Sequence, residues 1–216
     1  MGFIEFIQKE FFHAAPTLAA GLFAIAIILE RYKALTKTYP MKNGKAFFEK
    51  IQEMIEKGQT SQAVAFCDQY IEKPVARVVK TAISRGHLPE EAIESGINIT
   101  IQEVSHDIQK RTAFLATIAN VATLMGLFGT IAGLIASFKA VATADPALKS
   151  QMLSDGISTA MNATMLGLAV AIPCMVAFSF LMNRSNKLMA EVEEAALKTV
   201  DALKLRYFNQ ADDKVS

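Results

Sequence analysis

The sequence predicts an all-α membrane protein with three transmembrane helices, two of them long and extended into a cytoplasmic helical bundle. Three observations support this prediction: three long stretches almost free of charge, apolar residues repeating at helical spacing between them, and no useful run of alternating polarity. Hydrophobic residues make up 52% of the chain and the mean hydropathy is +0.28, which is high for a soluble domain. With 22 Lys and Arg against 21 Asp and Glu, the chain lacks the cationic surplus of most nucleic-acid-binding proteins.

The three apolar stretches are residues 11–29, 113–138 and 156–183, each long enough to cross a hydrocarbon core of about 30 Å. The first follows ten residues with two Glu and one Lys, so a retained span is expected rather than a cleaved signal. The expected divisions are an outer N-terminus with the first span (1–30), a cytoplasmic helical domain (31–112), a second span (113–141), a short periplasmic loop (142–155), a third span (156–183), and a cytoplasmic C-terminal helix and tail (184–216).

The distribution of Lys and Arg predicts the orientation of these spans. Residues 30–112 hold thirteen of them and residues 184–216 hold six, whereas the opposite side holds three. Because positive residues collect on the cytoplasmic side, the N-terminus is expected outside and the C-terminus inside.

The cytoplasmic domain is predicted to contain several helices. Apolar residues from Phe47 to Ile55 indicate the first, which Gly58 ends. Thr60 or Ser61 is expected to cap the second, and Pro74 ends it and opens a third that stops at Gly86.

A fourth helix is predicted to begin at Pro89 and to continue into the second span. No Pro interrupts residues 90–145, so we expect one helix of about 80 Å at 1.5 Å per residue. An apolar stripe from Leu188 to Tyr207 extends the third span into the cytoplasm in the same way.

No enzyme, metal or cofactor site is expected. Cys67 and Cys174 fall in different compartments, and His13, His87 and His106 are scattered, so no metal-ligand spacing occurs. A nucleophile with a neighbouring base is also not visible.

The two later spans each carry small and hydroxyl-bearing residues along one helical face. Such a face lets helices pack closely, but two of them could also line one shared cavity. An amide such as that of Asn162 needs a hydrogen-bond partner in hydrocarbon. In the second span the face consists of Ala116, Ala119, Thr123, Gly126, Thr130, Gly133 and Ser137, and in the third of Ala160, Thr164, Gly167, Ala171 and Cys174, with Ser158, Thr159 and Asn162 adding polarity at its outer end.

The later spans contain no acid, although proton transfer across a bilayer normally uses groups that change charge. Hydroxyls can orient a proton through water but cannot store one near neutral pH. If the chain conducts protons, the titrating carboxylate is therefore expected on another chain.

Two runs resemble the ExbB/TolQ/MotA proton-channel family. Residues 115–119 (Leu-Ala-Thr-Ile-Ala) and 126–133 (Gly-Leu-Phe-Gly-Thr-Ile-Ala-Gly) are similar to its second span, and residues 163–173 (Ala-Thr-Met-Leu-Gly-Leu-Ala-Val-Ala-Ile-Pro) to its third. Three spans resemble the ExbB/TolQ branch, since MotA has four.

This resemblance implies a bacterial inner-membrane pentamer around a pore that holds the spans of two ExbD/TolR-type partners, each with a membrane Asp. Thr130 and Thr164 match the pore threonines that face this Asp, and Pro173 is expected to bend its helix. The other polar and small residues of the two faces would form a partner-facing seam: Thr123, Gly126, Gly133, Ser137, Ser158, Thr159, Asn162 and Gly167.

One position departs from the family pattern. ExbB and TolQ carry a Glu five residues before the third-span Thr, where this chain has Thr159. The role of that Glu is not transferred, so the client stays open between Ton-like, Tol-like, motility and other systems. Thr oxygens would also suit a sodium route. The alternative hypothesis is a non-conducting membrane scaffold that recruits cytoplasmic partners.

Overall fold

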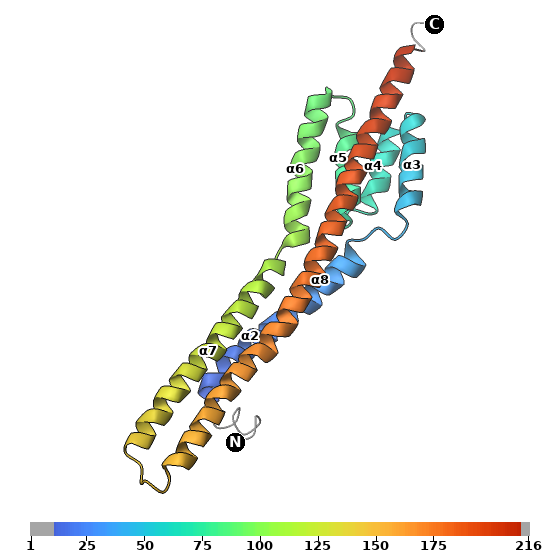
Figure 1. The fold of residues 1–216 in the computed structure, drawn as a ribbon. Helices are drawn as coiled ribbons and strands as arrows, with labels where there is room; N and C mark the ends of the chain where they lie inside the picture. The colour runs from blue at the N-terminus through green and yellow to red at the C-terminus, as the bar shows by residue number, and fades with distance from the viewer. Residues whose placement is uncertain (1–10, 213–216) are drawn as a thin grey trace. The chain divides into compact units, whose positions relative to one another are not determined.

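The computed structural model describes residues 11–212, and the side chains of residues 14–207. Every regular element in this range is a helix, as predicted (Figure 1). The expected outer N-terminus lies outside the described residues. The elements are α2 (Phe11–Lys33), the π-helix η1 (Ala34–Thr38), α3 (Gly44–Glu56), α4 (Thr60–Asp68), α5 (Pro74–Ser84), α6 (Glu90–Gln109), α7 (Thr112–Ala142) and α8 (Lys149–Asp212).

Three helical stretches are long and apolar enough to cross a membrane, in agreement with the three predicted spans. They are Ala14–Thr38, Glu90–Ala142 and Lys149–Tyr207. Many large apolar side chains on them are exposed in the single chain, such as Phe23, Phe128 and Val176 at 59–69%. Exposed apolar surface of this extent suits contact with lipid or with other membrane helices.

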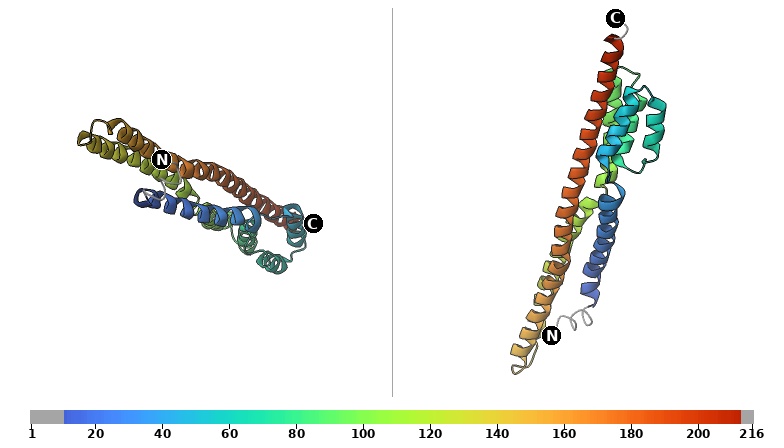
Figure 2. Two further views of the ribbon diagram at one scale, coloured as in Figure 1. Left: turned by 90° about the horizontal axis from the view of Figure 1, so that it is seen from below. Right: turned by 90° about the vertical axis from the view of Figure 1, so that its right-hand side faces the viewer.

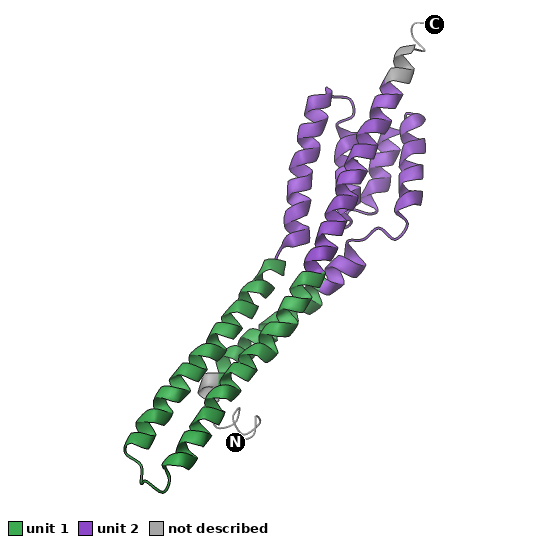
Figure 3. Ribbon diagram, in the orientation of Figure 1, with its two compact units in different colours: residues 1–31, 111–180 green, residues 32–110, 181–216 purple. Residues whose placement is uncertain are grey.

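The chain forms two compact units (Figure 3). In its described part, the first unit contains α2 to Arg31, α7, and α8 as far as Phe180. The second contains η1, α3 to α6, and the remainder of α8. In the first unit, α7 and the first part of α8 run side by side, as the two views of Figure 2 show.

The second unit is a helical bundle whose boundaries largely follow the predicted ones. Its core includes Ile51, Val78, Val79 and Val104, all at most 1% exposed. The rings of Phe47 and Phe66 stack with their centres 5.5 Å apart. Pro74 begins α5, as predicted. The predicted cap at Thr60 or Ser61 is wrong, because α4 already begins at Thr60, and the preceding Gln59 makes no side-chain capping bond.

The prediction of one uninterrupted helix over residues 90–145 is also wrong. α6 ends at Gln109 and α7 begins at Thr112, because Arg111 adopts a left-handed conformation with φ of 61°. For a residue with a Cβ this conformation costs roughly 1–2 kcal/mol. The Arg111 guanidinium donates hydrogen bonds to both carboxylate oxygens of Glu30, at 2.7 and 2.6 Å, and this charged pair offsets part of the cost.

The helix of the third span begins earlier than the predicted span. α8 starts at Lys149, seven residues before position 156, and continues through Pro173. Pro146 cannot continue α7, and the Asp145 carboxylate accepts a hydrogen bond from the Ala147 N–H at 3.2 Å, which forms a tight turn.

Candidate functional site

The two polar faces predicted from the sequence meet each other within one chain. A Cβ at Gly126 would lie 3.2 Å from the Cα of Gly167, and a Cβ at Gly133 would lie 3.1 Å from the Cβ of Ala160. At Gly167 a Cβ would lie only 2.6 Å from the carbonyl oxygen of Ala122. Such close approach of α7 and α8 requires glycine, as in many membrane helix pairs. Packing within the chain thus occupies three glycines that we predicted to face a partner.

Thr130 and Thr164 lie opposite each other in this contact, and their hydroxyls are hydrogen-bonded to one another. The Thr164 hydroxyl also lies 3.2 Å from the carbonyl oxygen of Gly126, and the Thr130 hydroxyl lies 3.1 Å from the same oxygen. A further acceptor for Thr130 is the carbonyl oxygen of Ala160 at 3.3 Å. Each hydroxyl has one proton but two lone pairs, so the pair keeps acceptor capacity for a further donor. Both side chains are half-buried and therefore partly accessible.

The helix α2 covers one flank of the α7–α8 pair, and the threonines lie toward the other. Ala14 of α2 packs with Ala163 and Leu166, and a Cβ on Gly21 would lie 3.2 Å from a methyl group of Val170. Successive residues of an α-helix are about 100° apart around its axis. Viewed along α8, Ala163 and Leu166 therefore lie to one side of the face that contacts α7, and Thr164 lies to the other side. The hydroxyl pair is therefore left accessible on the flank that α2 does not cover.

Apolar side chains surround the hydroxyl pair on this uncovered flank. Leu127 neighbours Thr130, and Met161 and Leu168 neighbour Thr164, by helical spacing. These three side chains are 41–65% exposed in the single chain. A polar pair within an apolar surface is suited to a buried contact with another membrane helix that carries one polar group.

Five other predicted residues form no hydrogen bond with the threonine pair. Ser137 donates to the carbonyl of Gly133 at 2.7 Å and packs against Gly156, while Thr159 donates to the carbonyl of Asp155 at 2.9 Å. Ser158 and Asn162 lie about 120° and 160° around α8 from Thr164 by helical spacing. The Asn162 amide nitrogen is buried and has no hydrogen-bond partner among the described residues. Thr123 is exposed and donates to the carbonyl of Ala119.

A groove of about 340 Å³ lies on the other flank of the pair, and four residues of the two predicted faces line it: Gly133, Ser137, Thr159 and Ala160. Its lining is made of small residues, such as Gly129 and Ala136 of α7, together with Thr159 and Ala163 of α8. The small residues repeat at helical spacing, which indicates that they share a face of each helix. This periodicity does not show on which flank of the α7–α8 pair that face lies.

No Asp, Glu, His, Lys or Arg occurs in residues 113–138 or 156–183. The hydroxyl pair can accept a hydrogen bond from a protonated acid or orient a water molecule, but it cannot hold a proton. Among the described side chains, those of residues 14–207, no three His, Cys, Asp or Glu gather as metal ligands would. The pair can therefore guide a proton that another group carries, or offer its oxygens to a cation, but it cannot supply the titrating group.

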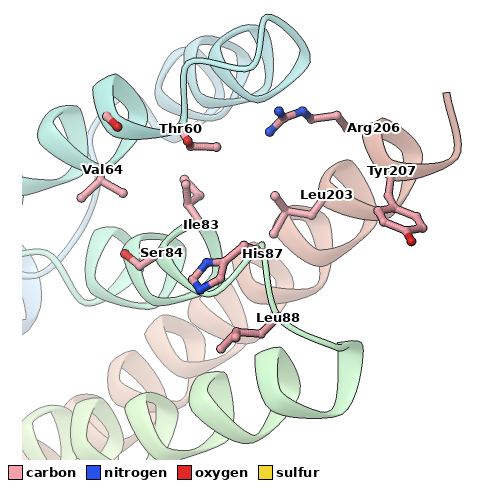
Figure 4. A pocket seen from close by; sticks show the side chains of 11 residues that line it. Thr60, Val64, Ile83, Ser84, His87, Leu88, Leu203, Arg206 and Tyr207 are labelled. Carbon is pink, nitrogen blue, oxygen red and sulfur yellow. The ribbon is translucent and has the colours of Figure 1, made fainter. Parts of the chain in front are cut away.

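The second unit contains a cavity of about 660 Å³ at the start of α4 (Figure 4). Thr60, Ser84 and His87 line it, and the Arg206 guanidinium points across it toward Thr60. Gly58, at φ of +75°, lies beside this guanidinium, since a Cβ there would be 3.4 Å from it. No sequence motif predicted this cavity, because its lining comes from three separate segments.

The sequence profile of the MotA/TolQ/ExbB proton channel family matches residues 70–194, which is more than half of the chain. The chain belongs to this family. The matched region takes in α5, α6, α7 and most of α8, so both threonines lie within it. The resemblance found in the two motifs is thereby confirmed, and the family is one of membrane channels.

Individual relatives carry ExbB and TolQ names. A putative biopolymer transport protein ExbB homolog of Methanothermobacter thermautotrophicus is 29% identical over 177 residues, which cover 81% of this chain and 61% of that protein. The Tol-Pal system protein TolQ of Haemophilus influenzae is 29% identical over 185 residues, covering 78% and 77%. The biopolymer transport protein exbB1 of Vibrio cholerae is 33% identical over 100 residues, covering 46% and 44%. The chain thus spans from under half to about three quarters of these relatives.

The ion pair between Glu30 and Arg111 is a feature of this ExbB/TolQ-type chain that the sequence analysis missed. Its two residues are separated by 81 positions. Glu30 directly follows the apolar stretch that ends at residue 29, and Arg111 shortly precedes the one that begins at residue 113. These positions were the sequence signal from which the pair could have been predicted. Two opposite charges at the same boundary of adjacent spans can pair there without entering hydrocarbon.

Proposed function

We propose that this protein is the channel subunit of an inner-membrane motor that uses the proton motive force to power envelope transport or related mechanical work. The observation that carries the proposal is the hydroxyl pair of Thr130 and Thr164, on a flank of α7 and α8 that no other described helix of the chain covers. Family membership supports proton conduction as the activity.

The titrating group in this proposal belongs to an ExbD/TolR-type partner. A membrane Asp on a single partner span approaches the two threonines, because the later spans of this chain contain no acid of their own. When protonated, the Asp donates to a threonine oxygen, and when ionised it accepts from a hydroxyl. The pair thus stabilises both states of the acid, which lowers the energy of passing the proton along.

The proposed assembly is a pentamer with its N-termini in the periplasm and its C-termini in the cytoplasm, around the spans of two partners. The distribution of Lys and Arg supports this orientation. The exposed apolar side chains around the threonines, such as Leu127 and Met161, support contact with further helices.

The test is proton flux into vesicles that contain this chain and an Asp-bearing partner. Thr130→Val and Thr164→Val remove a hydroxyl while changing shape little, and we expect each to reduce flux about tenfold or more, because a lost hydrogen bond to a charged group costs about 1.5–3 kcal/mol. Thr117→Val is the matched control, because this exposed residue lies about 180° around α7 from Gly126. It should leave flux unchanged.

The same experiment separates this proposal from the scaffold hypothesis, with which the glycine packing of α7 and α8 is equally compatible. A scaffold predicts that Gly167→Ala disturbs assembly, whereas the two threonine substitutions have no effect on ion movement. Flux that is equal in wild type, Thr130→Val and Thr164→Val would contradict the channel proposal. Replacing the proton gradient by a sodium gradient in the same vesicles identifies the coupling ion.

A further inference from the structure

A pocket of about 400 Å³ at the beginning of α3 combines three lysines with aromatic rings. Lys42, Lys50 and Lys73 contribute the charges, and Phe66 and Tyr70 contribute rings. None of the described residues that line the pocket is acidic. Its lining is therefore both cationic and apolar, which is an unusual combination for a surface that binds only water.

Two of the three lysines are held by direct contacts with uncharged groups. The ammonium group of Lys50 lies 4.5 Å from the centre of the Phe66 ring, and that of Lys73 donates to the carbonyl oxygen of Thr38 at 2.5 Å. Within the described part of the chain, no carboxylate forms an ion pair with Lys42, Lys50 or Lys73. These positive charges are therefore available to an anion.

The surrounding stretch of chain is also strongly basic. Residues 30–50 contain six Lys and Arg against two Glu, whereas residues 51–110 contain six against nine Asp and Glu. The basic charge thus concentrates directly after the first predicted span. Clusters of this kind next to a span attract anionic lipids of the cytoplasmic leaflet.

The chain enters this pocket soon after the first apolar stretch in the sequence. Lys42 follows residue 29, the end of the first apolar stretch, by thirteen positions, and α2 and η1 occupy the chain as far as Thr38. Lysines that follow a span this closely in sequence form the pattern that recognises anionic headgroups of the cytoplasmic leaflet.

We propose that this pocket binds the phosphate group of an anionic phospholipid from the cytoplasmic leaflet. The three ammonium groups neutralise the phosphate, while Phe66 and Tyr70 contact the less polar glycerol region. A neutral phospholipid carries its own cation and gains less from three lysines. The site is independent of Thr130 and Thr164, so failure of either proposal leaves the other standing.

The test is binding of phosphatidylglycerol to the full chain purified in neutral detergent, measured as bound lipid by native mass spectrometry. The triple variant Lys42→Gln, Lys50→Gln, Lys73→Gln should bind phosphatidylglycerol about a hundredfold more weakly, since each lysine near an anionic headgroup contributes about 1 kcal/mol. Glutamine keeps a hydrogen-bond donor at Lys73. Phosphatidylcholine should bind equally to wild type and variant.

The matched control is Lys33→Gln, Lys37→Gln, Lys45→Gln, which removes the same charge from exposed lysines of the same stretch outside the pocket. It should weaken binding by about tenfold or less, since these lysines attract anionic lipid only as part of the general basic charge of residues 30–50. Equal loss in both triple variants, or no loss in either, would overturn the proposal. Because Lys42 is exposed, Lys42→Gln alone cannot unfold the bundle, and a several-fold loss is expected from it.

Inorganic phosphate and glycerol phosphate are the second arm of the experiment. Both share the anionic group but lack acyl chains. If either displaces phosphatidylglycerol at an equal phosphate concentration, the pocket binds a soluble phosphate ester and the lipid assignment is wrong. Persistence of the lipid under those conditions supports it.

Discussion

The packing at Gly167 leaves no room for a single additional methyl group. A Cβ there would lie 2.6 Å from the carbonyl oxygen of Ala122 and 2.9 Å from the Cα of Gly126, both of which are backbone atoms. We therefore expect Gly167→Ala to lower the free energy of unfolding by about 1–3 kcal/mol, measured by thermal unfolding in detergent. Gly44→Ala is the control, because a Cβ at Gly44 meets nothing within 4 Å and should be neutral or slightly stabilising.

The thiol of Cys67 is predicted to be inert in the folded protein. Its side chain is 0% exposed, and burial raises the pKa of the thiol to about 12. At pH 8 only about one molecule in ten thousand would carry the reactive thiolate. We expect iodoacetamide to label Cys67 only after denaturant is added, as measured by peptide mass spectrometry. Labelling of the folded protein at the rate of a free thiol would contradict this burial.

An acid-dependent contribution to stability is expected from Asp107. The hydrogen bond from Arg77 at 2.8 Å, with smaller effects of Lys110 and His106, lowers the pKa of this carboxyl. A lowered pKa in the folded state stabilises the fold above the unfolded pKa of about 4, and this stability is lost as the pH falls through the folded value. Between pH 6 and pH 3 the melting temperature of wild type should fall more steeply than that of Asp107→Asn.

The break between α6 and α7 gives a prediction about whole helices. Arg111 has a left-handed backbone and pairs with Glu30. Arg111→Ala loses the ion pair and keeps the backbone strain, whereas Arg111→Gly loses the ion pair but also relieves the strain. Arg111→Gly should therefore be more stable than Arg111→Ala by about 1 kcal/mol, measured by thermal unfolding. If the order is reversed, as helix propensity alone would predict, then residue 111 continues the helix.

Local sequence signals account for most helix boundaries, but not for this break. Gly58 and Pro74 act through their own backbones, so the ends of α3 and the beginning of α5 could be predicted. The break at Arg111 involves neither Gly nor Pro, and its ion-pair partner lies 81 residues away. A local pattern contains no information about such a distant partner. The absence of Pro from residues 90–145 therefore wrongly suggested a continuous helix.

The candidate site was predictable in composition but not in arrangement. Helical spacing correctly gathered Gly126 and Thr130 on one face of α7, and Thr164 and Gly167 on one face of α8. It could not show that the two faces contact each other, because that depends on the turn between the helices and on their register. Helical spacing also could not show which flank of the pair α2 covers, because that is set by contacts between residues far apart in sequence, such as Ala14 and Ala163.

At the scale of the whole molecule, the chain by itself should not conduct protons. Its two later spans contain no group that titrates near neutral pH, and the threonine hydroxyls are bonded to each other. We expect vesicles with this protein alone to show the proton permeability of empty vesicles, measured with a pH-sensitive dye. Adding an Asp-bearing single-span partner should raise it. Conduction by the isolated chain at the rate of the complex would place the titrating group in this chain.

The most direct measurement is disulfide cross-linking between this chain and the membrane Asp position of its partner, changed to Cys. Cys67→Ala and Cys174→Ala provide the background, and Thr130→Cys, Thr164→Cys or Thr117→Cys supplies the second thiol. We predict cross-linked heterodimers from positions 130 and 164 and none from 117. Cross-linking from Thr117→Cys alone would show that the hydroxyl pair faces away from the acid and would contradict the proposed proton path.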